Sequence, residues 1–309
     1  MVTTVFTNTT RTIPAEVGQG VGGLADLSGN DNHATQATAA ARPIYQTAPD
    51  RVTLDGVDDR LSVTVPVGGF TGTMVLATDQ GTASYGVNIP AGTYDIGGRG
   101  GLYFPGNAIL GQVIRDGALS AGDAAATEAY FVGNGATAGY GSVTDFTTFW
   151  RNWSEITSFP LIDTSTGTHF NAAWDSCRGL TSFPLVDTSS GTDFSQAWRD
   201  CRNLTSFPLV DTSSGTDFYL SWFNCKSLTS FPANAFDNVK GGNFSNAFAS
   251  TTLTQTSIDN ILVSLVASGI SAGTRVFDQS GGSAPSSTGE AAIDTLRSRG
   301  WTVAVTGGY

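Results

Sequence analysis

Apolar residues recur every 24 positions through the middle of the chain. The sequence Thr-Ser-Phe-Pro occurs four times, each time after Ile or Leu, and Phe, Trp and Cys positions keep the same spacing. The members are Ile156, Leu180, Leu204 and Leu228; Phe146, Phe170, Phe194 and Phe218; Trp150, Trp174, Trp198 and Trp222; and Cys177, Cys201 and Cys225. A repeat this short cannot enclose its own apolar side. The pattern therefore predicts a solenoid of stacked coils over residues 142–252.

The repeat Phe-x-x-x-Trp-x-x-Cys-x-x-Leu-x-x-Phe-Pro-Leu resembles the leucine-rich repeats of bacterial surface proteins, which also occur in bacteriophage tail and adhesin proteins. Met or Phe often occupies the two aromatic positions there, so Phe and Trp here imply a broader core. Residues 180–194 and 204–218 are identical, which indicates recent duplication. The fifth copy, residues 244–253, is displaced by two residues, and we expect the array to end there.

Residues 1–135 carry a different pattern of short alternating runs, which predicts a β-sandwich. Two such runs flank a Gly/Asp turn within residues 52–65, and Ser120-Ala-Gly-Asp123 predicts the start of one short helix, residues 121–131. Glycine-rich breaks at 68–73, 97–101 and 133–141 separate further strands that we expect at 73–77, 85–89 and 108–114.

This region resembles the laminin-G/concanavalin-like lectin sandwich. The resemblance rests on Leu27-Ser-Gly-Asn-Asp-Asn-His-Ala-Thr35, on Arg42-Pro43, and on residues 54–61 and 113–120. Residues 70–108 are too few for the usual middle strands of that family, so the resemblance implies a truncated lectin-like domain. The carbohydrate or calcium site of the family is not carried over, because Asp55, Asp58 and Asp59 suit Asx turns better than a metal.

Residues 253–309 predict an α/β cap on the array, so that the whole chain is expected to be mainly β. A helix is expected from Ser257, with Ile258, Ile261, Leu262 and Leu265 on its apolar face, and a strand at 274–277. A second helix, residues 288–299, is expected to end at Gly300 before a last strand, residues 301–305. Open arrays need polar caps, and this segment resembles the one that closes such repeats in phage tail proteins.

The charge of the chain limits its partners. Charged residues make up only 13%, and the formal net charge is −11, which disfavours nucleic acid or an anionic membrane as a general partner. Residues 1–6 show no basic segment before an apolar run, and no stretch approaches the length of about 20 apolar residues that inserts into a membrane. We therefore expect a soluble protein without a Sec signal, which would leave the cell through lysis, as part of a virus particle.

Little in the sequence indicates catalysis or a cofactor. It contains no G-x-S-x-G, P-loop, H-E-x-x-H or dinucleotide motif, and His33 and His169 are far apart. A pair of carboxylates could still act as a glycosidase, which the sequence leaves open. The three cysteines form no C-x-x-C pair, so we expect a ladder of reduced, buried and inert side chains without a metal. The protein is expected to be neither an enzyme nor a cofactor carrier.

Binding candidates lie where packing does not fix the residue. The period-locked tryptophans are expected to be a buried ladder, whereas Tyr219 and Phe223 occupy positions that change from coil to coil. A row of cations follows the cysteine ladder and could hold an anionic partner; alternatively, it could pair with nearby Asp or with capping carbonyls. A row of Asp residues is expected to accept turn N–H groups. The cations are Arg178, Arg202 and Lys226, and the Asp row is Asp163, Asp187 and Asp211.

These resemblances imply a bacteriophage virion attachment protein, a tail fibre or spike, whose array recognises a host-surface polysaccharide or protein. The alternative is a structural capsid or tail decoration protein that binds neighbouring virion subunits; a secreted bacterial adhesin is disfavoured by the missing signal. In either virion role we expect a homo-oligomer that is assembled in the host cytoplasm, contacts other virion proteins, binds no nucleic acid and inserts into no membrane.

Overall fold

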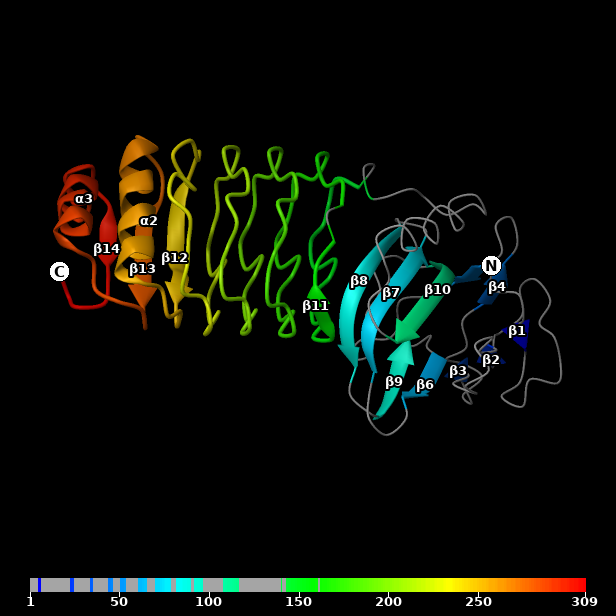
Figure 1. Cartoon of the computed structure of the whole chain (residues 1–309). Coiled ribbons are helices and arrows are strands. Elements are labelled where there is room, and N and C mark those ends of the chain that lie inside the picture. Colours follow the sequence, from blue (N-terminus) through cyan, green and yellow to red (C-terminus); the bar gives the residue numbers. More distant parts are fainter. Residues whose placement is uncertain are drawn as a thin grey trace. The chain divides into compact units, whose positions relative to one another are not determined.

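The computed structural model describes the strands of residues 1–116, Tyr140, and residues 143–160 and 162–309. The chain divides into two compact units, Met1–Tyr140 and Gly141–Tyr309 (Figure 1). Several sequence predictions lie outside the described residues: the helix at 121–131, the motif at 27–33, Arg42-Pro43, and the turn residues Asp55, Asp58 and Asp59.

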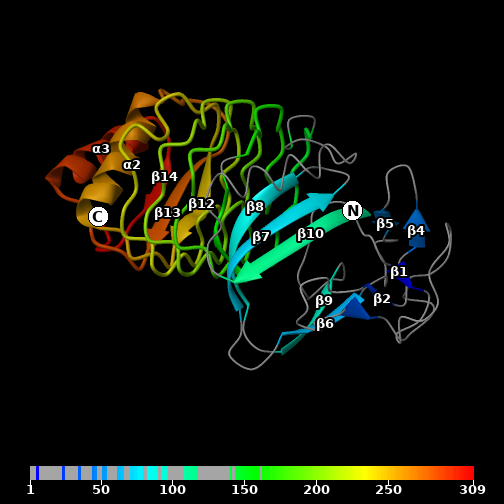
Figure 2. The same cartoon turned by 45° about the vertical axis from the view of Figure 1, so that its right-hand side comes forward.

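The strands of the first unit form two antiparallel sheets (Figure 2). One is ordered β1-β2-β3-β6-β9, and in the other β8, β7, β10, β5 and β4 follow one another. The bounds are β1 Val5–Phe6, β2 Gly23–Leu24, β3 Ala34–Thr35, β4 Ile44–Gln46, β5 Arg51–Thr53, β6 Leu61–Val65, β7 Phe70–Thr78, β8 Thr82–Ile89, β9 Gly92–Ile96 and β10 Ala108–Asp116.

The strands expected at 73–77, 85–89 and 108–114 are confirmed as β7, β8 and β10, each of them longer than predicted. Strand β9 was not foreseen. The break expected at 68–73 is wrong over its last four residues, because β7 begins at Phe70. Gly72 pairs with Val87 on one side and with Asp116 on the other. A glycine held between two neighbouring strands belongs to the sheet, although its residue type alone suggests a break.

The second unit is a stack of 24-residue coils whose core consists of repeated side chains (Figure 1). Three aromatic ladders run through the stack: the Phe four residues before each Trp, the Trp itself, and the Phe of each Thr-Ser-Phe-Pro sequence. Within each ladder, the ring centroids of consecutive coils are 5.2 to 5.8 Å apart. The third ladder meets the tryptophans edge to face, as at Phe183 and Trp174, 4.9 Å and 79°. All four tryptophans of the ladder are fully buried, which confirms the expected packing. Stacked and edge-to-face pairs each add about 0.5–1.5 kcal/mol beyond burial.

Hydrogen bonds join each coil to the next along the stack. The N–H groups of Phe170, Ala172, Trp174 and Ser176 donate to carbonyls of the following coil at 2.7–2.9 Å. Buried threonines add a side-chain link: the hydroxyls of Thr164, Thr188 and Thr212 each donate to a carbonyl of the next coil at 2.5 Å. Among the described residues of the four coils with the Thr-Ser-Phe-Pro sequence, one regular strand is present, β11 (Ile156–Ser158). The coils are therefore joined by individual hydrogen bonds that recur at the same positions of the repeat.

The segment from Phe to Cys in each coil is a run of turns, which we call the turn segment. In the second coil Ala173 N–H donates to Phe170 O, and Asp175 N–H donates to Ala172 O, at 3.1 and 3.2 Å. Two residues per turn segment have positive φ without being glycine, for example Ala172 (φ 51) and Ser176 (φ 62). This conformation costs about 1–2 kcal/mol per residue for an L-amino acid. It is retained here because both residues donate to the adjacent coil.

The three cysteines are free and buried, and each S–H donates to a Trp carbonyl of the preceding coil at 3.1–3.2 Å. Burial raises the pKa of all three thiols above the usual range. A thiol with a raised pKa forms little thiolate, the reactive species. We therefore expect no reaction of the folded protein with a soluble disulfide reagent, and three equivalents after unfolding in urea. Rapid labelling under native conditions would contradict the buried ladder.

The fifth coil lies within the predicted array, residues 142–252, and continues the same stack. Strand β12 (Gly242–Ala249) places Phe244 on Phe218 at 4.6 Å and Phe248 on Trp222 at 5.0 Å. The two extra residues are taken up in the preceding loop, where Phe236 is buried against Phe218 and Trp222. The ladder therefore persists through the shift in sequence phase.

The cap extends the same stack as a parallel sheet. Strand β12 pairs with β13 (Arg275–Ser280), which pairs with β14 (Thr302–Ala304). Helix α2 (Gln255–Ala267) buries the four predicted residues of its apolar face, and helix α3 (Ser287–Ser298) is followed by Gly300 at φ 82. Both helices and both strands were expected, with bounds that differ by a few residues. Neither described helix is long and apolar enough to span a membrane.

Candidate binding site on the turn face

The turn segments carry the cations of the array. Residues 147–154, 171–178, 195–202 and 219–226 hold five Lys or Arg and two Asp, a formal charge of +3 in a chain of −11. The loops at 161–169, 185–193 and 209–217 hold five Asp and no Lys or Arg. Taken together, the turn segments are therefore cationic and the loops are anionic. We call the outer surface formed by the turn segments the turn face.

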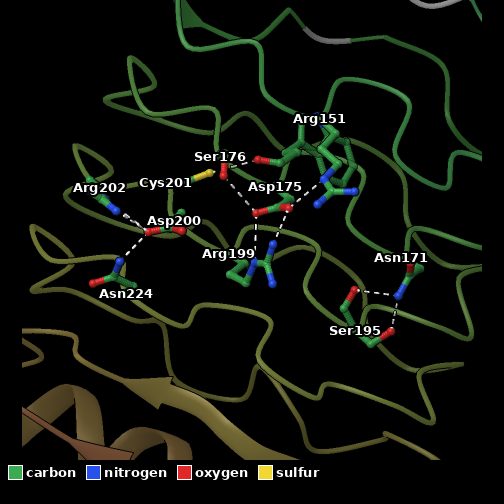
Figure 3. A network of polar contacts seen from close by, with 11 residues as sticks. Arg151, Asn171, Asp175, Ser176, Ser195, Arg199, Asp200, Cys201, Arg202 and Asn224 are labelled. Atoms are coloured by element: carbon green, nitrogen blue, oxygen red, sulfur yellow. Dashed lines mark hydrogen bonds and ion pairs between the residues drawn. The ribbon is translucent and has the colours of Figure 1, made fainter. Parts of the chain in front are cut away.

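Asp175 is the centre of the polar network on this face (Figure 3). Its carboxylate is fully buried between arginines of the two neighbouring coils. Arg199 donates through Nε to Oδ1 at 3.0 Å and through Nη2 to Oδ2 at 2.8 Å, and Arg151 Nε donates to Oδ2 at 2.9 Å. The hydrogen bonds from Arg199 to Asp175 raise the pKa of Arg199. A buried carboxylate needs such partners, since leaving it unpaired costs several kcal/mol.

A second network lies beside the first in the next coil (Figure 3). Asp200 accepts from Arg202, 3.0 Å away, and from the side chain of Asn224. Asn171 Nδ2 also donates to Ser195 Oγ at 2.5 Å. These bonds join positions that differ in residue type from coil to coil. Some of the variable positions therefore form hydrogen bonds with one another across neighbouring coils. Their residue types are not determined by core packing.

The structure separates the five predicted site residues into three kinds. Arg178 and Lys226 are exposed, as a contact surface requires. Arg202 is half-buried and paired with Asp200, so the alternative of pairing with a nearby Asp holds for this member. Tyr219 is 39% exposed, and Phe223 is half-buried. All five lie on turn segments, with the aromatic pair confined to the fourth coil.

Sequence reasoning missed the contribution of Arg151 and the pairing of Asp175 with Arg199. Their signal was present: positions 151, 175 and 199 alternate in charge at the repeat spacing. Two exposed leucines were also missed, Leu185 at 61% and Leu209 at 50%. Both follow the Pro of the repeat and precede the Asp-Thr-Ser loop.

The Asp row has the role expected from its sequence. Oδ1 of Asp163, Asp187 and Asp211 accepts the N–H of the Ser two residues later at 2.8–3.0 Å. Hydrogen bonds from Ser165 lower the pKa of Asp163. All three Asp residues are exposed. They are turn caps that keep a charged group at the surface.

In the part of the chain that the structure describes, no group of three or more His, Cys, Asp or Glu residues could hold a metal ion. Comparisons with protein-family models, with curated proteins and with solved structures found no match. Function must therefore be inferred from the chemistry of the turn face and from the resemblances of the sequence.

Proposed function

We propose that this protein is a bacteriophage virion attachment protein that binds an anionic glycan or protein on the host surface through the turn face. The observation that carries the proposal is a cationic face of formal charge +3 on an acidic chain. Its side chains vary between coils, and they stand on a core of recurring aromatic positions. A rigid scaffold that presents varied residues is suited to recognition.

The proposed architecture agrees with this role. We propose that the coils are leucine-rich repeats of the bacterial surface type and that the first unit is a truncated lectin-like sandwich that docks on the particle. Tyr219 and Phe223 supply apolar surface beside the cations, a combination that suits a sugar ring with an acidic group. The protein would then be located in the virion, with other virion proteins as its neighbours.

The second candidate is a decoration protein of the capsid or tail that binds neighbouring virion subunits. The pairing of Arg202 with Asp200 favours the decoration protein, because one of the three cations already has an acidic partner within the chain. Imaging of particles carrying a gold label on this protein separates the two: label at the tail tip supports attachment, and label over the shell supports decoration.

The cation row can be tested by replacing Arg178, Arg202 and Lys226 with Gln together. Exposed ion contacts are individually worth about 0.2–1 kcal/mol, so only the combined change should have a large effect. We expect adsorption of particles to host cells to fall about tenfold or more, and the salt dependence of adsorption to weaken.

A matched control is Lys240→Gln, which removes one exposed cation outside the turn segments. It should leave adsorption unchanged. Binding of the purified chain to a polyuronate, with neutral dextran as the blank, reports the same contact without the particle. Normal adsorption, assembly and salt dependence of the triple variant would refute the proposed role of the row and direct the search to the first unit.

A further inference from the structure

The loop end of each coil forms a second surface that complements the turn face. It combines exposed carboxylates with exposed leucines, and each leucine precedes its Asp by two residues. The members are Asp163, Asp187, Asp211, Leu185 and Leu209, which we call the acidic edge. The cation row of Arg178, Arg202 and Lys226 stands at the other end of the same Leu-Thr-Ser-Phe-Pro-Leu segment, with Tyr219 and Phe223 on the same face.

The two surfaces also match in spacing. Both rows have one residue per coil, and the aromatic rings of successive coils stack with centroids 5.2 to 5.8 Å apart, so both rows share the period of the stack. Two copies lying side by side with parallel axes would therefore bring three cations opposite three carboxylates at one lateral offset. An unrelated partner would need the same period to form all three pairs.

The carboxylates of the acidic edge can accept a further partner. The serine hydrogen bonds of Asp163, Asp187 and Asp211 all reach Oδ1, which leaves Oδ2 for a cation from outside. Leu185 and Leu209 are exposed in an otherwise hydroxyl-rich segment, where Thr181, Ser182 and Thr205 are also exposed. Apolar area next to a charge row is characteristic of an interaction surface.

We propose that the acidic edge of one copy docks on the cation row of a second copy, so that the chain self-associates laterally through unlike surfaces. The inference rests on the proposed function in that it names a second copy as one anionic partner of the turn face. Such a contact leaves one unpaired surface of each kind at the ends of a dimer, so association proceeds to a closed ring or an open row. A ring around an axis is compatible with a fibre or spike.

The test is sedimentation velocity of the purified full chain over a range of concentrations. One neutral variant carries Gln at the three cation positions, and the other carries Asp163→Asn, Asp187→Asn and Asp211→Asn. Asn keeps the turn cap, because its side-chain oxygen still accepts the serine N–H. We expect wild type to associate and each neutral variant to associate about tenfold or more weakly.

Charge reversal makes the test specific for this pairing. One variant carries Glu at Arg178, Arg202 and Lys226, and the other carries Lys at Asp163, Asp187 and Asp211. Each should be monomeric alone, and an equimolar mixture should associate again. A mixture that stays monomeric, an Asn variant that associates like wild type, or a monomeric wild type would each overturn the inference.

These outcomes are separable from those of the proposed function. If the Gln variant loses host adsorption while wild type is monomeric, the self-association is wrong and host binding stands. If the Gln variant adsorbs normally while the reversed pair associates only when mixed, host binding through the row is wrong and the self-association stands.

Discussion

Replacing Trp198 with alanine should lower the free energy of unfolding of the array by about 3–5 kcal/mol. The side chain is fully buried, stacked on Trp174 and Trp222 at 5.3 Å, and in edge contact with Phe207 at 4.8 Å. Its neighbours belong to continuous ladders and cannot close the gap without breaking register with the coils above and below. The loss therefore combines transfer and cavity terms.

Tryptophan fluorescence during urea unfolding measures this effect on the second unit alone. All six tryptophans lie between residues 150 and 301, so the first unit contributes none to the signal. Leu185→Ala is the matched control, because it truncates an exposed side chain in the same coil and should change stability by about 0.5 kcal/mol or less. An unchanged midpoint for Trp198→Ala would mean that the tryptophans are surface residues.

The ladders could be predicted from the sequence because each core position recurs several times at the same spacing. A single buried Trp is ambiguous, but four at one spacing, together with Phe and Leu in the same phase, leave one consistent arrangement. The Asp caps followed from local chemistry in the same way, since Asp and the Ser two residues later form a turn without help from distant residues.

Periodicity cannot tell the inside of a coil from its outside. Leu185 and Leu209 repeat with the same spacing as Leu180 and Leu204, yet the first two are exposed and the others fully buried. Position relative to the turn decides the side, and that depends on backbone angles. The left-handed residues Thr148, Ala172, Gln196 and Leu220 show the same limit, because none is a residue type that indicates positive φ.

The alternation of charge at positions 151, 175 and 199 indicates the pairing of Asp175, but its burial does not follow from the sequence pattern. A charged position whose residue type changes from coil to coil suggests an exposed contact. Its burial arises from two arginines supplied by different coils, 24 residues away on either side. The pair is a property of the stack, comparable to a cross-strand pair in a sheet. The ion pairs of the turn face therefore depend on which coils are neighbours.

The order of the coils should consequently affect stability as much as their number. Deleting residues 181–204 or residues 205–228 removes one complete coil in either case, with the same large core side chains: two Phe, one Trp, one Cys, one Leu and one Val; buried Ala197 of the first segment corresponds to buried Ser221 of the second. Both deletions rejoin Leu to Thr within the repeat, so the backbone period is preserved. Each deletion should give a folded, shorter stack with a lower free energy of unfolding.

The main difference between the two deletions lies at Asp175; removal of 205–228 also removes Asn224, which donates to Asp200, but leaves Asp200 paired with Arg202. Removal of 205–228 keeps Arg199 in the next coil, whereas removal of 181–204 places Phe223 there and leaves the carboxylate with Arg151 and the Ser176 hydroxyl. Losing two charge-assisted hydrogen bonds to a buried carboxylate should make the 181–204 deletion less stable than the other by about 2–3 kcal/mol. Urea unfolding followed by tryptophan fluorescence compares the two directly.

A substitution within the less stable deletion isolates the cause. Phe223→Arg in the 181–204 deletion restores an arginine opposite Asp175 and should recover most of the difference, whereas the same substitution in the full-length chain adds an arginine next to Arg199 and should stabilise nothing. Equal stability of the two deletions would show that Arg151 and Ser176 are sufficient partners for Asp175. Recovery by Phe223→Arg would instead establish that pairing between neighbouring coils, in addition to the aromatic ladders, determines which coil can follow which.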